Sequence, residues 1–174
     1  MSNRVTICKI SKIRAHVAAL LAWLLLSLSC ALSFADDFHL VDTTGKSHDL
    51  SAYKGQWVLV NFWATWCPPC LEEMPDLQKL HETHKDLVVI GIAMDYKDPK
   101  YVISFAEDLL VTFPIVLGDQ KIAAQFGRLS GLPTTYLYSP QGNLVAQNVG
   151  ALTRQSVERY IDQWRASAKQ PIQK

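Results

Sequence analysis

The sequence is poor in cysteine and in histidine. It has four cysteines in 174 residues, and only Cys67 and Cys70 lie beyond residue 30. Because one cysteine pair cannot make the framework of several disulfides that stabilises many small secreted domains, that class of protein is excluded. All five histidines lie at or before His84. A metal site built from several histidines in residues 85–174 is therefore excluded as well.

An excess of charge of either sign is also missing. The chain has 17 basic and 16 acidic residues, a formal net charge of +1. Four of the basic residues lie in the first 16 positions, so residues 36–174 keep 13 basic residues against all 16 acidic ones and carry a formal charge near −3. Since no basic patch stands out, we expect no nucleic-acid partner.

The first 35 residues differ in composition from the rest. Residues 17–35 contain no charged residue and follow a segment that has four cations and no acid. Small residues at Ser33 and Ala35 suit signal-peptidase cleavage before Asp36. The uncharged run is also long enough to cross a bilayer with the cations on the cytoplasmic side, so a retained anchor is a second interpretation.

A third interpretation is lipid attachment at Cys30, although Ser27 stands where a leucine is expected. All three interpretations export residues 36–174. We therefore expect residues 1–35 to be a signal peptide or an N-terminal membrane anchor. Residues 36–174 are expected to be one folded domain in the periplasm, soluble or tethered to the inner membrane, and large enough to form its own core.

Segments with strand-like and helix-like patterns alternate along residues 36–174. "FHLVDTTGKSHDL" (38–50) is typical of a hairpin, and "WVLVNFW" (57–63) of a buried central strand. The elements expected after them are a helix over 71–84, a strand over 87–94, a helix over 98–110, a short strand over 113–118, a short helix over 120–127, two strands within 134–150 and a helix over 153–168. Without an internal repeat or a linker, this order predicts one α/β domain.

The motif "WCPPC" (66–70) places two thiols between the end of a strand and the start of a helix. The first-turn amides and the helix dipole favour an anion there, which makes Cys67 a nucleophilic thiolate. Cys70, one helical turn later, can attack a mixed disulfide on Cys67 and release the partner. The spacing therefore predicts thiol–disulfide exchange.

Two prolines bear on the direction of electron flow. Pro68 and Pro69 have no backbone N–H, so the Cys67 sulfur loses two hydrogen-bond donors. A less stabilised thiolate means a less stabilised reduced form, which favours a reductant. The helix dipole acts in the opposite direction, so an oxidant that donates its disulfide stays an alternative.

Other uses of the two cysteines have less support in the sequence. A structural disulfide at this spacing would close a very short loop and stabilise little. Zinc needs four ligands and one CxxC motif supplies two, while a copper site would also need a nearby histidine. "HETH" (81–84) resembles a ligand pair, but a polar helix end is the favoured interpretation. We expect no metal and no cofactor, and a copper-handling thiol module stays an alternative.

Two longer segments carry a family resemblance. "VLVNFWATWCPPCLEEMP" and "GLPTTYLYSPQGNLV", followed by Gly150 and a final helix, resemble the thioredoxin superfamily. They are most similar to its exported TlpA/ResA-type thiol–disulfide oxidoreductases, which include a cytochrome c maturation branch. The resemblance covers nearly all of residues 38–168. It implies a thioredoxin-like fold with an N-terminal β-hairpin and a central mixed sheet flanked by helices.

The resemblance also assigns roles to residues. It implies that Cys67 is the attacking thiol and that Cys70 resolves the mixed disulfide. Pro133 would be a cis-proline against the disulfide, and Leu132 would offer backbone groups to an extended partner segment. Trp66 would flank the disulfide.

Two departures concern a proton acceptor and the branch of the family. Cytoplasmic thioredoxins carry a buried Asp where this chain has Asn61, whereas the ResA-type branch has a Glu similar to Glu73. On a helix Glu73 lies three residues after Cys70, so if buried it would have a raised pKa and could take the Cys70 proton. A solvated helix glutamate is the alternative. The cytochrome-maturation enzymes most often have a Pro-Glu-Thr segment at the cis-proline, where this chain has "GLPTT".

The sequence thus predicts an exported, monomeric thiol–disulfide oxidoreductase that reduces disulfides of exported client proteins, with an apo-cytochrome c among the candidates. A membrane thiol donor would re-reduce it, and the membrane is involved only through residues 17–35. Peroxiredoxins share the fold but place Thr three residues before the reactive cysteine, where this chain has Ala64. A peroxidase is therefore a further alternative, but a weak one, because this chain lacks that threonine.

Overall fold

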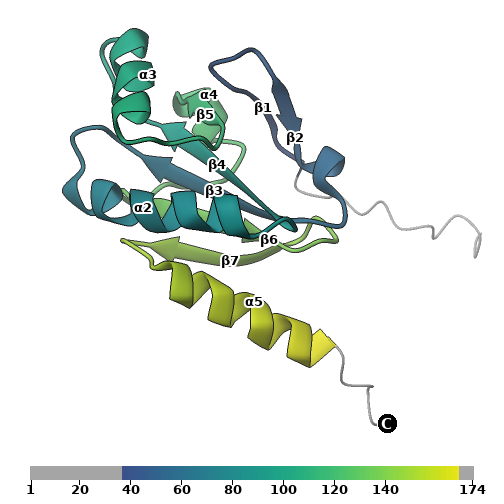
Figure 1. Ribbon diagram of the computed structural model, residues 1–174. Coiled ribbons are helices and arrows are strands. Elements are labelled where there is room, and N and C mark those ends of the chain that lie inside the picture. The colour runs from purple at the N-terminus through teal and green to yellow at the C-terminus, as the bar shows by residue number, and fades with distance from the viewer. Residues whose placement is uncertain (1–36, 169–174) are drawn as a thin grey trace, which may run out of the picture. The chain divides into compact units, whose positions relative to one another are not determined.

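The protein is described by a computed structural model that covers residues 37–168 (Figure 1). Its strands are β1 (His39–Val41), β2 (Ser47–Asp49), β3 (Trp57–Trp63), β4 (Leu87–Ala93), β5 (Ile115–Leu117), β6 (Thr134–Tyr138) and β7 (Leu144–Val149). Its helices are the 3₁₀-helix η1 (Leu50–Tyr53) and the α-helices α2 (Pro68–Thr83), α3 (Pro99–Asp108), α4 (Gln120–Ala123) and α5 (Arg154–Ala168).

Five strands form one mixed sheet in the order β5–β4–β3–β6–β7. β3, β4 and β5 run parallel to one another, whereas β6 is antiparallel to both β3 and β7. β1 and β2 form a separate antiparallel hairpin. In the register of the central strands, Asn61 of β3 lies beside Gly91 of β4 and Thr135 of β6. The predicted mixed sheet with an N-terminal hairpin is confirmed.

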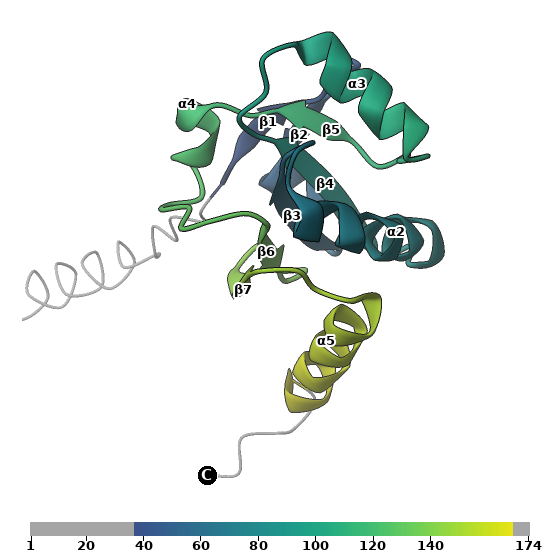
Figure 2. The same cartoon turned by 90° about the vertical axis from the view of Figure 1, so that its left-hand side faces the viewer.

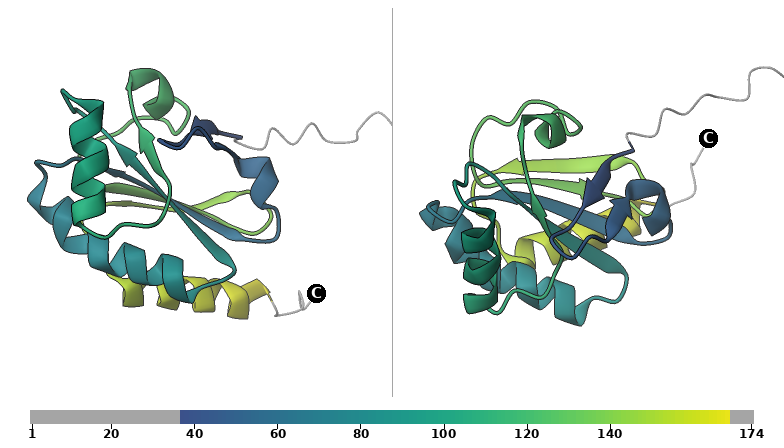
Figure 3. Two further views of the ribbon diagram at one scale, coloured as in Figure 1. Left: turned by 45° about the horizontal axis from the view of Figure 1, so that its top comes forward. Right: turned by 90° about the horizontal axis from the view of Figure 1, so that it is seen from above.

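The sheet separates two hydrophobic clusters, and its layers can be followed in Figures 2 and 3. The first cluster lies between the sheet and α2, α3 and α5, and includes Trp57, Leu59, Trp63, Met74, Leu77, Val102, Val157 and Ile161. The second lies between the sheet and the hairpin, η1 and the α4 segment, and includes Phe38, Leu40, Leu50, Val58, Val60, Phe62 and Phe126. Both faces of the sheet are therefore covered.

β3 is buried along its whole length. A central strand that is covered on both faces buries residues of both parities, so its sequence is a continuous apolar run without alternation. Asn61 is the one strongly polar residue in this run, and it is fully buried on the α2 side of the sheet, between Leu59 and Trp63. A buried amide at this position needs hydrogen-bond partners from the elements packed above the strand.

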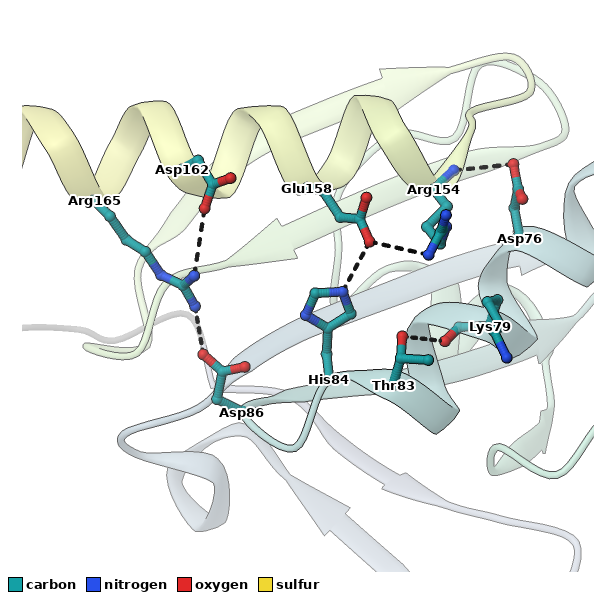
Figure 4. Close-up of polar contacts among 9 residues, drawn as sticks. All are labelled: Asp76, Lys79, Thr83, His84, Asp86, Arg154, Glu158, Asp162 and Arg165. Carbon is teal, nitrogen blue, oxygen red and sulfur yellow. Dashed lines mark hydrogen bonds and ion pairs between the residues drawn. The ribbon is translucent and has the colours of Figure 1, made fainter.

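Polar contacts fasten α5 to α2 (Figure 4). The backbone N–H of Arg154, the first residue of α5, donates to Asp76 Oδ2 at 3.0 Å. His84 Nε2, just beyond the end of α2, lies 3.0 Å from Glu158 Oε1. A carboxylate of α2 therefore caps the N-terminus of α5, where free amides and the helix dipole favour negative charge.

Several predicted elements begin or end elsewhere. α2 begins at Pro68 and not at residue 71, because proline is favoured in the first helical turn, where an N–H would lack a partner. β5 and α4 are shorter than the strand and helix expected over 113–118 and 120–127. The predicted signal peptide or anchor, residues 1–35, lies outside the described residues. Within residues 37–168, no helix is long and apolar enough to cross a membrane.

Candidate active site

Both cysteines lie where the chain passes from β3 into α2. Cys67 is the N-cap residue of α2, and Cys70 lies within its first turn. A disulfide joins them, with their Cα atoms 5.3 Å apart. Cys67 is 3% exposed whereas Cys70 is fully buried, so Cys67 is the one of the two with any solvent contact. This asymmetry matches the predicted roles of an attacking and a resolving thiol.

The start of α2 offers few backbone donors to the Cys67 sulfur. Pro68 and Pro69 occupy the first two helical positions and have no N–H. The next two amides, of Cys70 and Leu71, donate to the Cys67 carbonyl oxygen at 3.0 and 3.2 Å. Among the backbone groups of this turn, stabilisation of a thiolate is therefore left to the helix dipole.

The loop that leads into β6 adjoins the core beneath the cysteines. The Leu132–Pro133 peptide bond is cis, as predicted. The Pro133 carbonyl accepts the Gly150 N–H at 2.9 Å, which links this loop to the end of β7. Leu132 packs against the cluster that contains Cys67 and Cys70. Within residues 37–168, the backbone N–H and C=O of Leu132 make no hydrogen bond.

Trp66 is exposed beside the disulfide. Its side chain is 60% exposed, and its Nε1 donates to the Asp95 carbonyl oxygen at 3.3 Å. Asp95 and Leu132 both line a hollow of about 510 Å³. The other walls of this hollow come from the end of β4, from α4 and from the loop before β6, and include Met94, Gln120, Ala123, Leu129 and Gly131. Trp66 is thus bonded to a residue of one wall of this hollow, and Leu132 of the cis-proline loop belongs to another.

Glu73 is buried beneath the first turns of α2. It is 2% exposed, which decides against the solvated alternative. Its Oε1 accepts a hydrogen bond from Asn61 Nδ2 at 2.7 Å, and its Oε2 accepts one from the Leu152 backbone N–H at 2.9 Å. Burial raises the pKa of Glu73 to about 7, and the bonds from Leu152 and Asn61 act in the opposite direction. A carboxyl group that titrates near neutral pH suits proton transfer.

The predicted contact between Glu73 and Cys70 takes a different form. In the disulfide form described here, no hydrogen bond joins the two residues, because the Cys70 sulfur has no proton to donate; the carboxylate oxygens accept from Asn61 and Leu152 instead. Glu73 still lies on the same helix, one turn after Cys70. Proton transfer between them thus belongs to the dithiol form, in which the Cys70 sulfur is free.

Sequence reasoning missed two partners of Glu73. The sequence singles out Asn61 only as a replacement of the acid found in cytoplasmic thioredoxins. It gives no sign of a role for Leu152, or for Thr135, the second partner of Asn61. Asn61 Nδ2 also donates to Thr135 Oγ1 at 3.0 Å, so Asn61 links β3 to both α2 and β6. The signal that could have found Asn61 is a strongly polar side chain inside an apolar strand, since such a group needs a buried partner.

The histidines of "HETH" have separate partners. His81 packs against the Phe113 ring, and burial lowers its pKa, while His84 lies against Glu158. This fits the polar helix end and not a ligand pair. In the described part of the chain, no group of three His, Cys, Asp or Glu side chains could hold a metal ion.

Known proteins resemble this chain in sequence and structure. Residues 33–147 match the AhpC/TSA family. The thiol-disulfide oxidoreductase ResA of Geobacillus kaustophilus (strain HTA426) is 37% identical over 131 residues, which make up 75% of each chain. The thioredoxin-like protein YneN of Bacillus subtilis (strain 168) is 37% identical over 74% of this chain and 76% of its own. A DsbF homologue from Corynebacterium diphtheriae matches with a TM-score of 0.66 and 32% identity, over 73% of this chain and 83% of its own.

The site and these relatives agree on the chemistry. Ala64, which stands where peroxiredoxins have a threonine, is fully buried and has no polar side-chain group, so the peroxidase alternative gains no support. Cys67 and Cys70 already form the disulfide that an exchange reaction needs. The chain therefore belongs to the AhpC/TSA family of thioredoxin-like proteins and is a thiol–disulfide oxidoreductase of the ResA type.

Proposed function

We propose that this protein reduces disulfide bonds of client proteins outside the cytoplasm through the Cys67–Cys70 pair. The observation that supports this direction is the start of α2, where Pro68 and Pro69 provide no N–H to the Cys67 sulfur. A thiolate with fewer donors is less stabilised, so the dithiol form gives up its electrons more readily.

The reaction consists of two exchange steps. The Cys67 thiolate attacks one sulfur of the client disulfide, that S–S bond breaks, and the first client sulfur leaves as a thiolate and takes up a proton. Cys70 then attacks the Cys67 sulfur of the mixed disulfide, and the second client sulfur leaves. Two electrons pass from the cysteine pair to the client, and Glu73 accepts the proton of the Cys70 thiol.

Client binding uses Trp66, Leu132 and Pro133. The unpaired backbone groups of Leu132 can bond an extended client segment as a neighbouring strand would. The hollow of about 510 Å³ beside Leu132 can take side chains that flank the client cysteine. This mode recognises backbone more than sequence, so clients of different sequence fit it.

Export through residues 1–35 places the reaction in the periplasm. That compartment is kept oxidising, so a reductase there needs a dedicated supply of electrons, and a membrane thiol donor fills this role. Exported proteins that require free thiols are the clients, and an apo-cytochrome c is one of them.

The reduction potential of the pair tests the proposal. The full chain in detergent is equilibrated with a dithiothreitol or glutathione series, and the fraction of free Cys67 and Cys70 thiols is measured by trapping with a thiol reagent and mass spectrometry. A value near that of thioredoxin, about −270 mV, supports a reductase, whereas a value near about −120 mV would make the protein a disulfide donor. Stoichiometric copper in the purified protein would favour the metal-handling alternative. A variant with serine at positions 67 and 70 is the control.

A further inference from the structure

Both carboxylate oxygens of Glu73 face hydrogen-bond donors. Asn61 Nδ2 is 2.7 Å from Oε1, and the Leu152 N–H group is 2.9 Å from Oε2. This arrangement suits an ionised carboxylate, which only accepts hydrogen bonds. A protonated Glu73 must donate one, and in the described structure neither oxygen has an acceptor as its partner. Glu73 is 2% exposed, so bulk water is not a ready substitute.

An unused acceptor belongs to Asn61 itself. Asn61 Oδ1 is buried and has no hydrogen-bond partner within the described residues. A half-turn of the amide exchanges Oδ1 with Nδ2, so Oδ1 would then lie about 2.7 Å from Glu73 Oε1 and could accept its proton. Oxygen and nitrogen of an amide have nearly the same size, so this exchange needs no movement of the surrounding side chains.

Thr135 allows the same exchange on the other side of the amide. Its Oγ1 accepts from Asn61 Nδ2 at 3.0 Å in the described orientation. A hydroxyl group can donate as well as accept, so after the half-turn Thr135 can donate to Oδ1. The backbone N–H of Leu152 stays on Oε2 in both states, which leaves Oε1 as the oxygen that carries the proton.

We propose that Asn61 is a positioning residue for the exchange reaction: its side-chain amide turns over when Glu73 gains or loses a proton, and it thereby keeps the proton on Glu73 Oε1. The inference rests on the proposed function, in which Glu73 accepts the proton of Cys70. Cytoplasmic thioredoxins have an acid at the position of Asn61. Here Asn61 would change its orientation with the proton on Glu73 but would not bind that proton itself.

Few other groups can interfere with the titration of Glu73. The elements around it present Asn61 from β3, Thr135 from β6 and the Leu152 amide before α5, and none of these titrates. On α2, Cys70 is held in the disulfide, and Asp76 accepts the backbone N–H of Arg154. The Arg154 guanidinium is paired with Glu158, which also lies against His84.

A side-chain NMR titration of the oxidised full chain in detergent tests the proposal. Selective ¹⁵N labelling of asparagine leaves four side-chain amides, those of Asn3, Asn61, Asn143 and Asn148. We expect the Asn61 amide resonance to change between pH 5 and 9 with the same midpoint as the Glu73 carboxyl carbon. Asn148, whose Nδ2 donates to the Gly150 carbonyl oxygen, is the internal reference and should stay constant.

Two variants make the outcome decisive. Glu73→Gln places an amide donor opposite Asn61, so its Asn61 resonance should stay at the low-pH value at every pH. Glu73→Ala removes the partner and should abolish the pH dependence without holding that value. An Asn61 resonance that stays flat while Glu73 titrates overturns the proposal, as does a Glu73→Gln variant fixed at the high-pH value.

The proposed function fails by a different measurement. The titration is made on the disulfide form and needs no turnover. If Asn61 follows Glu73 while Glu73→Gln reduces a client disulfide at the wild-type rate at neutral pH, the amide switch stands and Glu73 has no role in exchange. If Glu73→Gln slows exchange but Asn61 stays flat, Glu73 keeps its role and Asn61 loses the one assigned here.

Discussion

At the scale of single residues, the two cysteines differ in access and not in chemistry alone. Cys67 retains a small exposed surface at the N-cap of α2, whereas Cys70 is covered by the helix and the core. A client sulfur can therefore approach Cys67 first, and Cys70 can act only on a disulfide that Cys67 has already formed. The order of the two exchange steps follows from this burial.

The first prediction concerns this order. Cys67→Ser should abolish disulfide exchange, because Cys70 has no access to a client. Cys70→Ser should accumulate a mixed disulfide between Cys67 and the client, since no thiol is left to resolve it. Non-reducing electrophoresis and mass spectrometry of the adduct detect the species. The chain should also carry serine at positions 8 and 30, so that the thiols of the leader segment cannot form adducts; a client trapped equally by Cys67→Ser would contradict the assignment.

The second prediction concerns the stability that Glu73 confers. Burial raises the pKa of Glu73 from 4.5 to about 7, so between these pH values the folded chain binds more protons than the unfolded chain. Its contribution to stability is therefore complete below pH 4.5 and is lost as the pH rises through about 7. A shift of this size corresponds to about 3 kcal/mol.

Urea unfolding at pH 4.5 and pH 8 measures this contribution. The wild-type free energy of unfolding should fall by about 3 kcal/mol more than that of Glu73→Gln, which cannot ionise. The comparison with this variant removes the contribution of the other carboxyl groups, which titrate in both proteins. Equal pH dependence of the two proteins would mean that Glu73 is not a buried group of raised pKa.

At the scale of elements, sequence patterns between neighbouring residues predict helices and strands well, whereas the sequence carries no signal for contacts between distant segments. The apolar run of β3 and the Asp98–Pro99 start of α3 follow from neighbouring residues, and the Asp98 side chain indeed accepts the Lys100 N–H at 2.9 Å. Glu73 and Leu152 are 79 residues apart, and no pattern in either segment indicates that the two are in contact. Their contact depends on the packing of α5 against α2, which joins segments far apart in the sequence.

α2 holds the N-terminal part of α5 with two carboxylates that lie three residues apart on the helix. Glu73 accepts the N–H of Leu152, and Asp76 accepts that of Arg154. The segment before α5 therefore lies along one face of the redox helix. Because the Leu152 N–H stays on Oε2 in both proposed protonation states of Glu73, this segment keeps its contact with α2 while the proton moves on Oε1.

The third prediction separates this cap from ordinary surface ion pairs (Figure 4). Asp76→Ala removes the acceptor of a helix N-terminal amide and should lower the free energy of unfolding by about 1 kcal/mol. Asp86→Ala removes the pair with Arg165, which joins α5 to the segment before β4, but both side chains are about half exposed. That variant should change the stability by less than about 0.5 kcal/mol.

Chemical denaturation of the two variants under one condition makes the comparison. Both changes remove one carboxylate that contacts α5, so they are matched in charge and in side-chain size lost. An equal loss in both would mean that the Asp76 contact adds nothing beyond surface electrostatics. Salt provides a second readout, because a screened ion pair weakens with ionic strength and a cap hydrogen bond does so less.

At the scale of the whole molecule, the site described above lies within residues 37–168. Both hydrophobic clusters, the disulfide, the cis-proline loop and the Asn61–Glu73 contact are formed by residues of this range. The expected function of residues 1–35 is to deliver the domain to its compartment, so delivery and catalysis should be separable by removing this segment.

The last prediction tests that separation. A chain that starts at residue 36 should reduce a model disulfide in vitro as fast as the full chain, because it keeps the described residues of both clusters and of the site. In cells the shortened chain should stay in the cytoplasm and fail to reduce exported clients, whereas the full chain reaches them. Labelling of Cys67 by a thiol reagent that does not cross the inner membrane reports the location, and the full chain with Cys67→Ser is the control for background labelling.

A shortened chain that is folded but inactive in vitro would assign residues 1–35 a part in the reaction. A shortened chain that is labelled from outside would show that export does not depend on those residues.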